Sequence, residues 1–428
     1  MSSPDTFKAL KVKHFPLLLI AGWTWGLSRW GVSFIGPFIA HELTGSARMV
    51  QLTGVALWAP MLFGGIIGGW ISDRFDRRRT MICQFLVTIP ALLVLSATEF
   101  LGILDVWMIY PVLFLAGAGM VFDMTGRRAI VYDLVGESNI DNAMALESTA
   151  TSTALALGAL AGGSLIQAAG IGWALTVMAG LQIIAVVTFS MVPRIDRLQK
   201  ATEGGLRAIT DGVKMLRTER GLISILGVTA CVNFFFFAST PLIQIVGRKF
   251  EVGPALLGLL ASMLGMGMFI GSLTVAKRQP KRRGRTYVIG SFAAFLFMSG
   301  FASAPWFLLA GLMLLVAAIG MGLFGSTQAV LVMDSVSPDK RGRALGLLTT
   351  AIGVLPIGML LLGELAEILG PSTAIVISVA TGAVLMSIFL RVRPECYHIL
   401  VKDVPPEKTF VDSAYSGSVF AVEPFLNS

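Results

Sequence analysis

The chain has 428 residues, of which 55% are hydrophobic and only 14% are charged, and it carries a formal net charge of +8. Its mean hydropathy of +0.78 is too high for a water-soluble domain, whose surface must be largely polar. These values exclude a water-soluble domain and indicate a protein whose solvent is lipid.

Apolar stretches recur along the chain from Phe15 to Leu390. Each has roughly the 20 residues that a helix needs to cross a bilayer core of about 30 Å. Such continuous runs favour helices over a membrane β-barrel, whose strands are about ten residues long and alternate in polarity. We therefore predict an all-α polytopic membrane protein of about twelve transmembrane helices. The predicted spans are 15–38, 50–71, 80–98, 105–125, 142–168, 171–192, 221–246, 253–276, 286–303, 305–327, 343–369 and 371–391.

Basic residues gather in alternate loops, a pattern that predicts orientation in a membrane rather than nucleic-acid binding. If the amino terminus is cytoplasmic, only Arg48, Arg248 and Lys249 lie on the outer side. The first span lacks a small-residue cleavage site, so we expect it to remain in the mature protein. We predict a multi-pass protein of the plasma (inner) membrane with both termini in the cytoplasm. The cytoplasmic loops hold Arg74–Arg79, Arg127 and Arg128, Arg194–Arg220, Lys277–Arg285 and Lys340–Arg343.

A polar segment separates the first six spans from the last six, and its apolar residues recur at helical spacing. We interpret it as a linker that forms an amphipathic helix on the cytoplasmic membrane face. The proposed division is an amino-terminal six-helix bundle at 1–193, the linker at 194–220, a second six-helix bundle at 221–393 and a cytoplasmic tail at 394–428.

The two halves repeat one another at a nearly constant offset. Asp133 and Asp334 are 201 residues apart, as are Ala143 and Ala344, and Gly69 lies 202 residues before Gly271. The spacing indicates a duplicated six-helix unit, and parallel repeats of this kind are known in transporters.

With these features the chain resembles the major facilitator superfamily, from Phe15 to Leu390. The family's loop between the second and third helices reads Gly, three residues, Asp, basic, any, Gly, basic, basic. Segments 122–146 and 356–370 resemble the exporter-like branch that includes enterobactin exporters. The loop pattern maps onto Gly69, Asp73, Arg74, Arg77 and Arg78, with Asp76 where the family usually has Gly. The likeness to the exporter branch rests on Arg127, Arg128, Asp133, Leu134, Asn142, Ala143, Pro356, Gly358, Gly363 and Ala366.

Two family features are incomplete. The antiporter signature of the fifth helix survives only as Gly158, Ala159, Gly162 and Gly163, which suit close helix packing. Residues 113–120 also lack the arginine that many proton antiporters carry in the fourth helix. Both departures weigh against proton-coupled antiport.

Asp73 ends the second span, where a carboxylate can bond arginines and cap a neighbouring helix. The resemblance directs it to the start of the eleventh helix and implies a cytoplasmic gate that opens during transport. The alternative is that the arginines only set topology. Val275 takes the place of Asp73 in the second half. The predicted gate comprises Gly69, Asp73, Arg74, Arg77, Arg78, Arg341 and Arg343.

Arg29 lies about 15 residues into the first span, near mid-membrane. A cation there costs at least roughly 2.5–3.5 kcal/mol, so it should face a wet cavity or a partner. The resemblance implies that the first, fourth, seventh and tenth helices line the cavity, where Arg29 would contact an anionic substrate group. A purely structural pair or a carbonyl-bonded arginine is the alternative. The predicted cavity residues are Arg29, Trp25, Asn233 and Gln244.

Asp123 and Glu147 are acids within the fourth and fifth spans and are candidates for a proton relay. Alternatively Asp123 bonds Arg127, four residues on, and Glu147 pairs with Arg128 or with the cytoplasmic loops. We expect no direct pair with Arg29, because both acids lie about 5–9 Å deep by helix rise and Arg29 about 20 Å.

The predicted function is secondary transport of a small molecule by alternating access, with export favoured on the resemblance. An uptake symporter, a uniporter and a non-transporting sensor are the alternatives. We expect no enzyme, because His14, His41 and His398 share no site with a nucleophile, and no ATP-binding sequence is present. We expect no cofactor or metal, inert thiols at Cys83, Cys231 and Cys396, a monomer, and protons as the candidate coupling ion.

Overall fold

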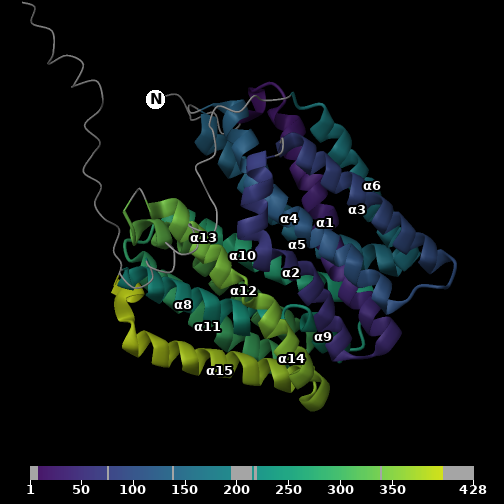
Figure 1. Ribbon diagram of the computed structural model, residues 1–428. Coiled ribbons are helices and arrows are strands. Elements are labelled where there is room, and N and C mark those ends of the chain that lie inside the picture. Colours follow the sequence, from purple (N-terminus) through teal and green to yellow (C-terminus); the bar gives the residue numbers. More distant parts are fainter. Residues whose placement is uncertain are drawn as a thin grey trace, which may run out of the picture.

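The computed structural model describes residues 8–74, 77–136, 139–193, 215, 219–337 and 340–398, although the side chains of 63–78, 122, 124–126, 128, 129 and 141 lie outside this description. The described chain is all-α (Figure 1). Nine of its helical segments are long and apolar enough to cross a membrane. The first half has helices α1 (Phe15–Thr44), α2 (Ala47–Arg74), α3 (Arg77–Phe100), α4 (Val106–Val135), α5 (Ile140–Ala169) and α6 (Ile171–Ser190). The second half has α8 (Arg220–Phe235), η3 (Phe237–Ser239), α9 (Leu242–Arg248), α10 (Pro254–Arg278), α11 (Arg283–Ser303), α12 (Phe307–Asp334), α13 (Arg341–Ile352), α14 (Leu355–Leu369) and α15 (Pro371–Val392), and short 3-10 turns lie at Lys8–Lys11 and Pro394–His398.

Each of the twelve predicted spans coincides with one helix or with one pair of consecutive helices, which confirms the all-α polytopic fold. Two spans differ from the prediction because they are broken. The seventh span is divided into α8 and α9 before Pro241, and the eleventh into α13 and α14 before Pro356. Proline lacks the amide hydrogen and crowds the carbonyl four residues earlier, so a helix tends to stop or bend there.

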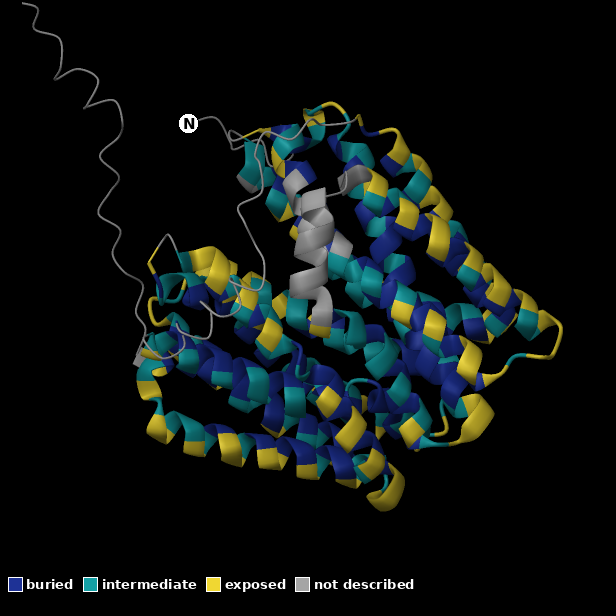
Figure 2. Cartoon of the chain, in the orientation of Figure 1, coloured by how far each residue is buried: buried dark blue, intermediate teal, exposed yellow. Residues whose placement is uncertain are grey.

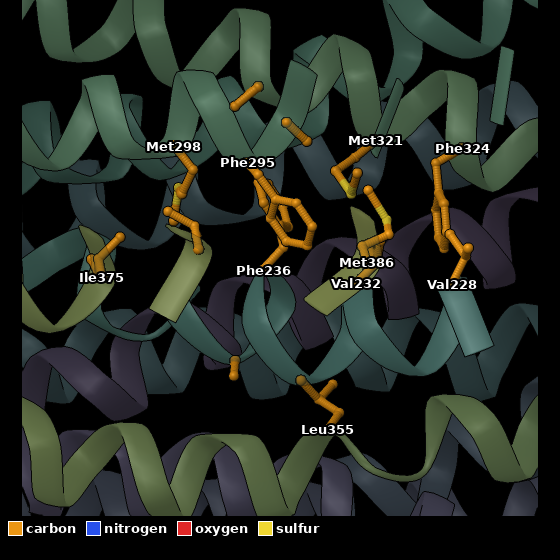
Figure 3. Packing of buried hydrophobic residues seen from close by; sticks show 14 of the residues in the cluster. Val228, Val232, Phe236, Phe295, Met298, Met321, Phe324, Leu355, Ile375 and Met386 are labelled. Carbon is orange, nitrogen blue, oxygen red and sulfur yellow. The ribbon is translucent and has the colours of Figure 1, made fainter. Parts of the chain in front are cut away.

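Helices α1–α6 form one bundle and helices α8–α15 the other (Figure 1). The second bundle has a continuous core around α8. Phe295 and Met298 of α11, Met321 of α12 and Met386 of α15 converge on Phe236 and its neighbours (Figure 3). Two further apolar clusters lie in the first bundle, one of which also includes Leu257 of α10. Most apolar burial is therefore within a bundle rather than between bundles.

The outer helix faces carry large apolar side chains, as lipid requires. Leu308 is 83% exposed, and Val94, Leu296 and Val384 are exposed as well. Figure 2 shows the outward side of α15 as largely exposed. In water such a surface would be unfavourable, so its extent agrees with a membrane-embedded protein.

Glycines bring α5 and α10 into direct contact between the halves. A Cβ added to Gly163 would lie 3.0 Å from the Gly258 Cα and would clash with the carbonyl oxygen of Pro254. Gly158 similarly faces the α1 backbone at Leu27 and Gly31. The predicted small-residue packing of the fifth helix is confirmed.

The linker prediction for 194–220 and the tail prediction for 394–428 fall mostly outside the described residues. Of the linker only Met215, Glu219 and Arg220 are described, and of the tail only the turn at Pro394–His398. That turn packs on the second bundle, where the Cys396 amide donates to Ser224 Oγ at 3.1 Å.

Candidate functional site

A cavity of about 450 Å³ lies between the two halves, and we call it the central cavity. Helices α1, α2, α4 and α5 line it from the first half, and α8–α10 and α12–α14 line it from the second. Aromatic and thioether side chains such as Trp58, Phe237 and Met268 make up much of its wall, and none of its described lining residues is charged. The polar lining residues are Ser33, Thr53, Asn233, Thr240, Gln244 and Gln328.

The amides of the central cavity are held by the backbone or by neighbouring hydroxyl groups. Gln244 Nε2 donates to the Phe34 carbonyl oxygen at 2.9 Å, which links the two halves. Asn233 Nδ2 donates to the Thr229 carbonyl oxygen at 2.9 Å. The buried Gln244 Oε1 has no hydrogen-bond partner among the described residues. An unmet buried acceptor costs about 1–3 kcal/mol, so this oxygen favours a ligand that brings a donor.

Both helix breaks border the central cavity, a feature that the sequence analysis missed. Phe237 and Pro241 flank the break between α8 and α9, and Ile352 and Leu355 flank the break between α13 and α14. Irregular backbone at membrane depth is tolerated where protein or a cavity surrounds it. The sequence signals, Thr-Pro at 240 and Gly-Val-Leu-Pro at 353, are visible in retrospect.

A second cavity of about 290 Å³ lies within the first half, among α1, α4 and α5, and we call it the charged cavity. Its lining includes Arg29, Asp123, Arg127 and Glu147. Trp30 and Met120 line both cavities, so the two share a wall. The structure thus divides the predicted substrate set: Asn233 and Gln244 lie in the central cavity, and Arg29 and Trp25 lie in the charged cavity.

Arg127 joins the two acids in a buried ion triad. Its Nε lies 2.7 Å from Asp123 Oδ1, its Nη2 donates to Asp123 Oδ2 at 3.0 Å, and its Nη1 lies 2.7 Å from Glu147 Oε2. All three residues are less than 10% exposed. The predicted bond between Asp123 and Arg127 is confirmed, and Glu147 pairs with Arg127 as well. The predicted partner of Glu147, Arg128, has its side chain outside the described residues.

The predicted position of Arg127 in a cytoplasmic loop is wrong. Helix α4 continues to Val135, so Arg127 is buried two turns before its end. Asp123 and Glu147 compensate the positive charge of Arg127, so the helix can continue past this residue. By helix rise Asp123 lies about 18 Å from the end of α4 and Glu147 about 11 Å from the start of α5, so both lie farther from the helix ends than predicted. The acids therefore line the same cavity as Arg29, although the structure gives no direct bond between Arg29 and either acid.

Arg29 is 2% exposed and stacks on aromatic rings. Its guanidinium carbon lies 4.4 Å from the centre of the Trp30 ring and 5.6 Å from that of Trp58. Its Nη2 donates to the Met120 sulfur at 2.8 Å, and its Nε has no hydrogen-bond partner among the described residues. The structure buries Arg29 within α1 against aromatic rings. Its predicted contact with an anionic substrate group stays a prediction.

The predicted cytoplasmic gate is only partly visible. Gly69 and Asp73 lie in α2, but their surroundings and the side chains of Arg74, Arg77 and Arg78 fall outside the described residues. Arg341 and Arg343 are exposed at the start of α13. The gate stays a prediction.

Polar contacts between the halves lie at the opposite end of the molecule and form what we call the outer latch. Arg48 Nη2 lies 2.7 Å from Glu364 Oε2, and Arg248 Nη2 lies 2.6 Å from Glu42 Oε1. Glu367 accepts from the Ser46 hydroxyl and from the Arg48 amide at 2.9 and 3.0 Å. In the sequence Arg48 and Arg248 indicate only topology, because partners about 200 or more residues away leave no local pattern.

No group of three or more His, Cys, Asp or Glu side chains in the described part of the chain is placed to hold a metal ion. Cys83, Cys231 and Cys396 are free thiols.

Comparison with known proteins gives a consistent family. A family model described as Major Facilitator Superfamily matches residues 18–357. Macrolide efflux protein A of Streptococcus pyogenes is 23% identical over 345 residues, covering 78% of this chain and 84% of that protein. Enterobactin exporter EntS of Shigella flexneri is 21% identical over 390 residues, covering 88% of this chain and 90% of that protein.

Solved structures agree on the fold. A variant of the nucleoside transporter NupG superimposes with a TM-score of 0.73 at 14% identity, covering 89% of this chain and 99% of that chain. A bacterial homolog to the human lysosomal transporter Spinster gives a TM-score of 0.65 at 15% identity, with coverage of 93% and 97%. At these identities the likeness concerns the fold alone.

Proposed function

The chain belongs to the major facilitator superfamily, and from this premise we propose that it exports a small, largely apolar molecule across the plasma membrane by alternating access. The central cavity carries the proposal, because its wall is built from both halves and would be exposed to either side as the halves rock. Relatives named as a macrolide efflux protein and an enterobactin exporter support the direction.

The chemistry of the central cavity supports an uncharged or amphipathic substrate body. Its aromatic and methionine side chains, including Met61, Met268 and Met321, offer an adaptable apolar surface. Asn233, Gln244 and Gln328 supply a few hydrogen-bonding groups, which would fix the orientation of a ligand. We propose Asn233 and Gln244 as the main polar contacts.

The outer latch supports loading from the cytoplasm. With the proposed topology, in which both termini are cytoplasmic, the latch lies on the outer side and closes that end between α1, α2, α9 and α14. Release would require the latch to open, and the predicted gate of Asp73 with Arg341 and Arg343 would then close the cytoplasmic end.

We propose the proton as the coupling ion and the ion triad as the place where it acts. Asp123 and Glu147 are buried carboxylates inside spans, a position that usually has a functional reason. Protonation of either acid would loosen its bond to Arg127, whose side chain also fills the space beside Gly22 of α1. The exchange would be one or more protons inward for one substrate outward, by a monomer, with these buried acids in place of the fourth-helix arginine that this chain lacks.

The test follows lumenal pH and labelled compound together in proteoliposomes, without a preset gradient, as candidate compounds are added outside. Proton antiport predicts lumenal alkalinisation that accompanies saturable entry of one compound. Entry with acidification would instead show symport, and entry without a pH change would show uniport or another coupling ion. No entry of any compound in a chemically broad panel would count against transport itself.

A further inference from the structure

The guanidinium of Arg29 is placed and partnered differently from every other charged group of the charged cavity. It is 2% exposed, yet of its N–H groups Nη2 meets only a thioether sulfur and Nε meets no acceptor among the described residues. A guanidinium has five donors in a fixed fork that suits a carboxylate or another oxyanion. The buried cation therefore has hydrogen-bonding capacity that its present surroundings leave unused.

The acids of the charged cavity do not use that capacity. Both oxygens of Asp123 bond Arg127, and Glu147 bonds Arg127 through Oε2. A cation whose only purpose was to pair with these acids would bond one of them, as Arg127 does. Arg29 balances the net negative charge of the triad from a distance while its donors face other groups.

Arg29 is also within reach of a molecule in the central cavity. Trp30, whose ring lies 4.4 Å from the guanidinium carbon, and Met120, whose sulfur accepts its bond, both line the central cavity as well. Met side chains have three rotatable bonds and change rotamer easily. A ligand oxygen that displaced the weakly accepting Met120 sulfur would gain a charge-assisted hydrogen bond.

We infer that Arg29 forms an anion subsite at the wall between the two cavities and binds the carboxylate, or an equivalent oxyanion, of an amphipathic substrate whose apolar body occupies the central cavity. This inference rests on the proposed function, because it assigns the body of the substrate to that cavity. The substrate class becomes organic acids with one bulky apolar part. The stacked Trp30 and Trp58 rings hold the guanidinium in place for this contact.

A matched pair of ligands tests the subsite: 1-naphthylacetate and its neutral amide, 1-naphthylacetamide, bound to the full-length protein in lipid nanodiscs. We expect the wild type to prefer the acid by about tenfold. This is the low end for hydrogen bonds to charged groups, because the net negative triad opposes an incoming anion. Arg29→Gln should remove the preference, chiefly through weaker binding of the acid. Arg29→Lys should keep part of it, and the exposed control Arg285→Gln should keep all of it.

Acetate identifies the source of the anion. Acetate that competes with 1-naphthylacetate but not with the amide supports a subsite for the substrate's own acidic group. Acetate that binds in an Arg29-dependent way without competing would overturn the link to the substrate and leave a site for a free anion.

Two other outcomes separate the inference from the proposed function. Equal binding of acid and amide by the wild type, or an unchanged preference in Arg29→Gln, overturns the subsite and leaves the central cavity as a binding site for the apolar body. If the wild type binds neither compound, the assignment of amphipathic molecules to the central cavity is refuted, and the subsite with it.

Discussion

The ion triad allows a stability prediction whose magnitude follows from its geometry. Replacing Arg127 by Met removes the shared partner of two carboxylates, each less than 10% exposed. Breaking one buried pair typically costs about 3–5 kcal/mol, because an uncompensated charge remains. We expect Arg127→Met to lower the free energy of unfolding by at least this amount. The exposed Arg285→Met should change it by no more than about 0.5 kcal/mol.

Removing all three charges together distinguishes pairing from mere packing. In the triple variant Asp123→Asn, Arg127→Met, Glu147→Gln no member of the triad stays charged without its partner, and only Arg29 loses a distant countercharge, so we expect it to lose less than half of what Arg127→Met loses. Unfolding is measured by titrating detergent-solubilised protein with sodium dodecyl sulfate and following tryptophan fluorescence at constant pH. A loss below about 1 kcal/mol in Arg127→Met, or a triple variant as unstable as the single one, would refute the assignment of the triad as a tightly paired unit.

Three further predictions concern the interface between the halves. Gly163→Leu should abolish transport, because its side chain would push α5 away from α10, whereas Gly180→Leu, at an open position, should transport normally in the same vesicle assay. Arg48→Glu should reduce the population closed at the outer end by up to about fivefold, since an exposed pair contributes at most about 1 kcal/mol. Adding Glu364→Arg should restore this population. Spin-label distances across the outer end measure it. Gln244→Leu should raise the KM for substrate. It should lower stability by only about 1 kcal/mol, because one neutral hydrogen bond to a backbone carbonyl is lost. An unchanged KM would show that Gln244 is not part of the substrate site.

The sequence predicts the helices well because bilayer thickness sets their length and each span must be apolar. It does not predict which prolines interrupt them. Pro37 and Pro60 lie inside the continuous helices α1 and α2, whereas Pro241 and Pro356 lie at breaks that border the central cavity. The difference is tertiary, since a freed carbonyl group is tolerated where neighbouring helices or a cavity can accommodate it.

The site was predicted in its parts but not in its assembly. Arg29 stands out in the sequence because a buried cation is costly, and the structure does bury it. The bond of Arg127 to Asp123 was predicted, but its burial was not, because a hydropathy pattern ends where charges begin; in the folded chain Asp123 and Glu147 compensate that charge and the helix continues. The pairing is made between α4 and α5, so no local spacing could reveal all of it.

The separation of the two cavities bears on the energetics of the proposed cycle. The charged cavity lies wholly within the first half, so its ion pairs would keep their partners while the halves rock as units. Rocking alone therefore does not change the cost of burying these four charged side chains; only the proposed protonation of Asp123 or Glu147 changes it. The contacts that must change are the apolar wall of the central cavity, the Gln244 bond to Phe34 and the exposed pairs of the outer latch. The hydrogen bond and the exposed ion pairs each contribute only about 1 kcal/mol, which suits a transporter that must leave either state readily.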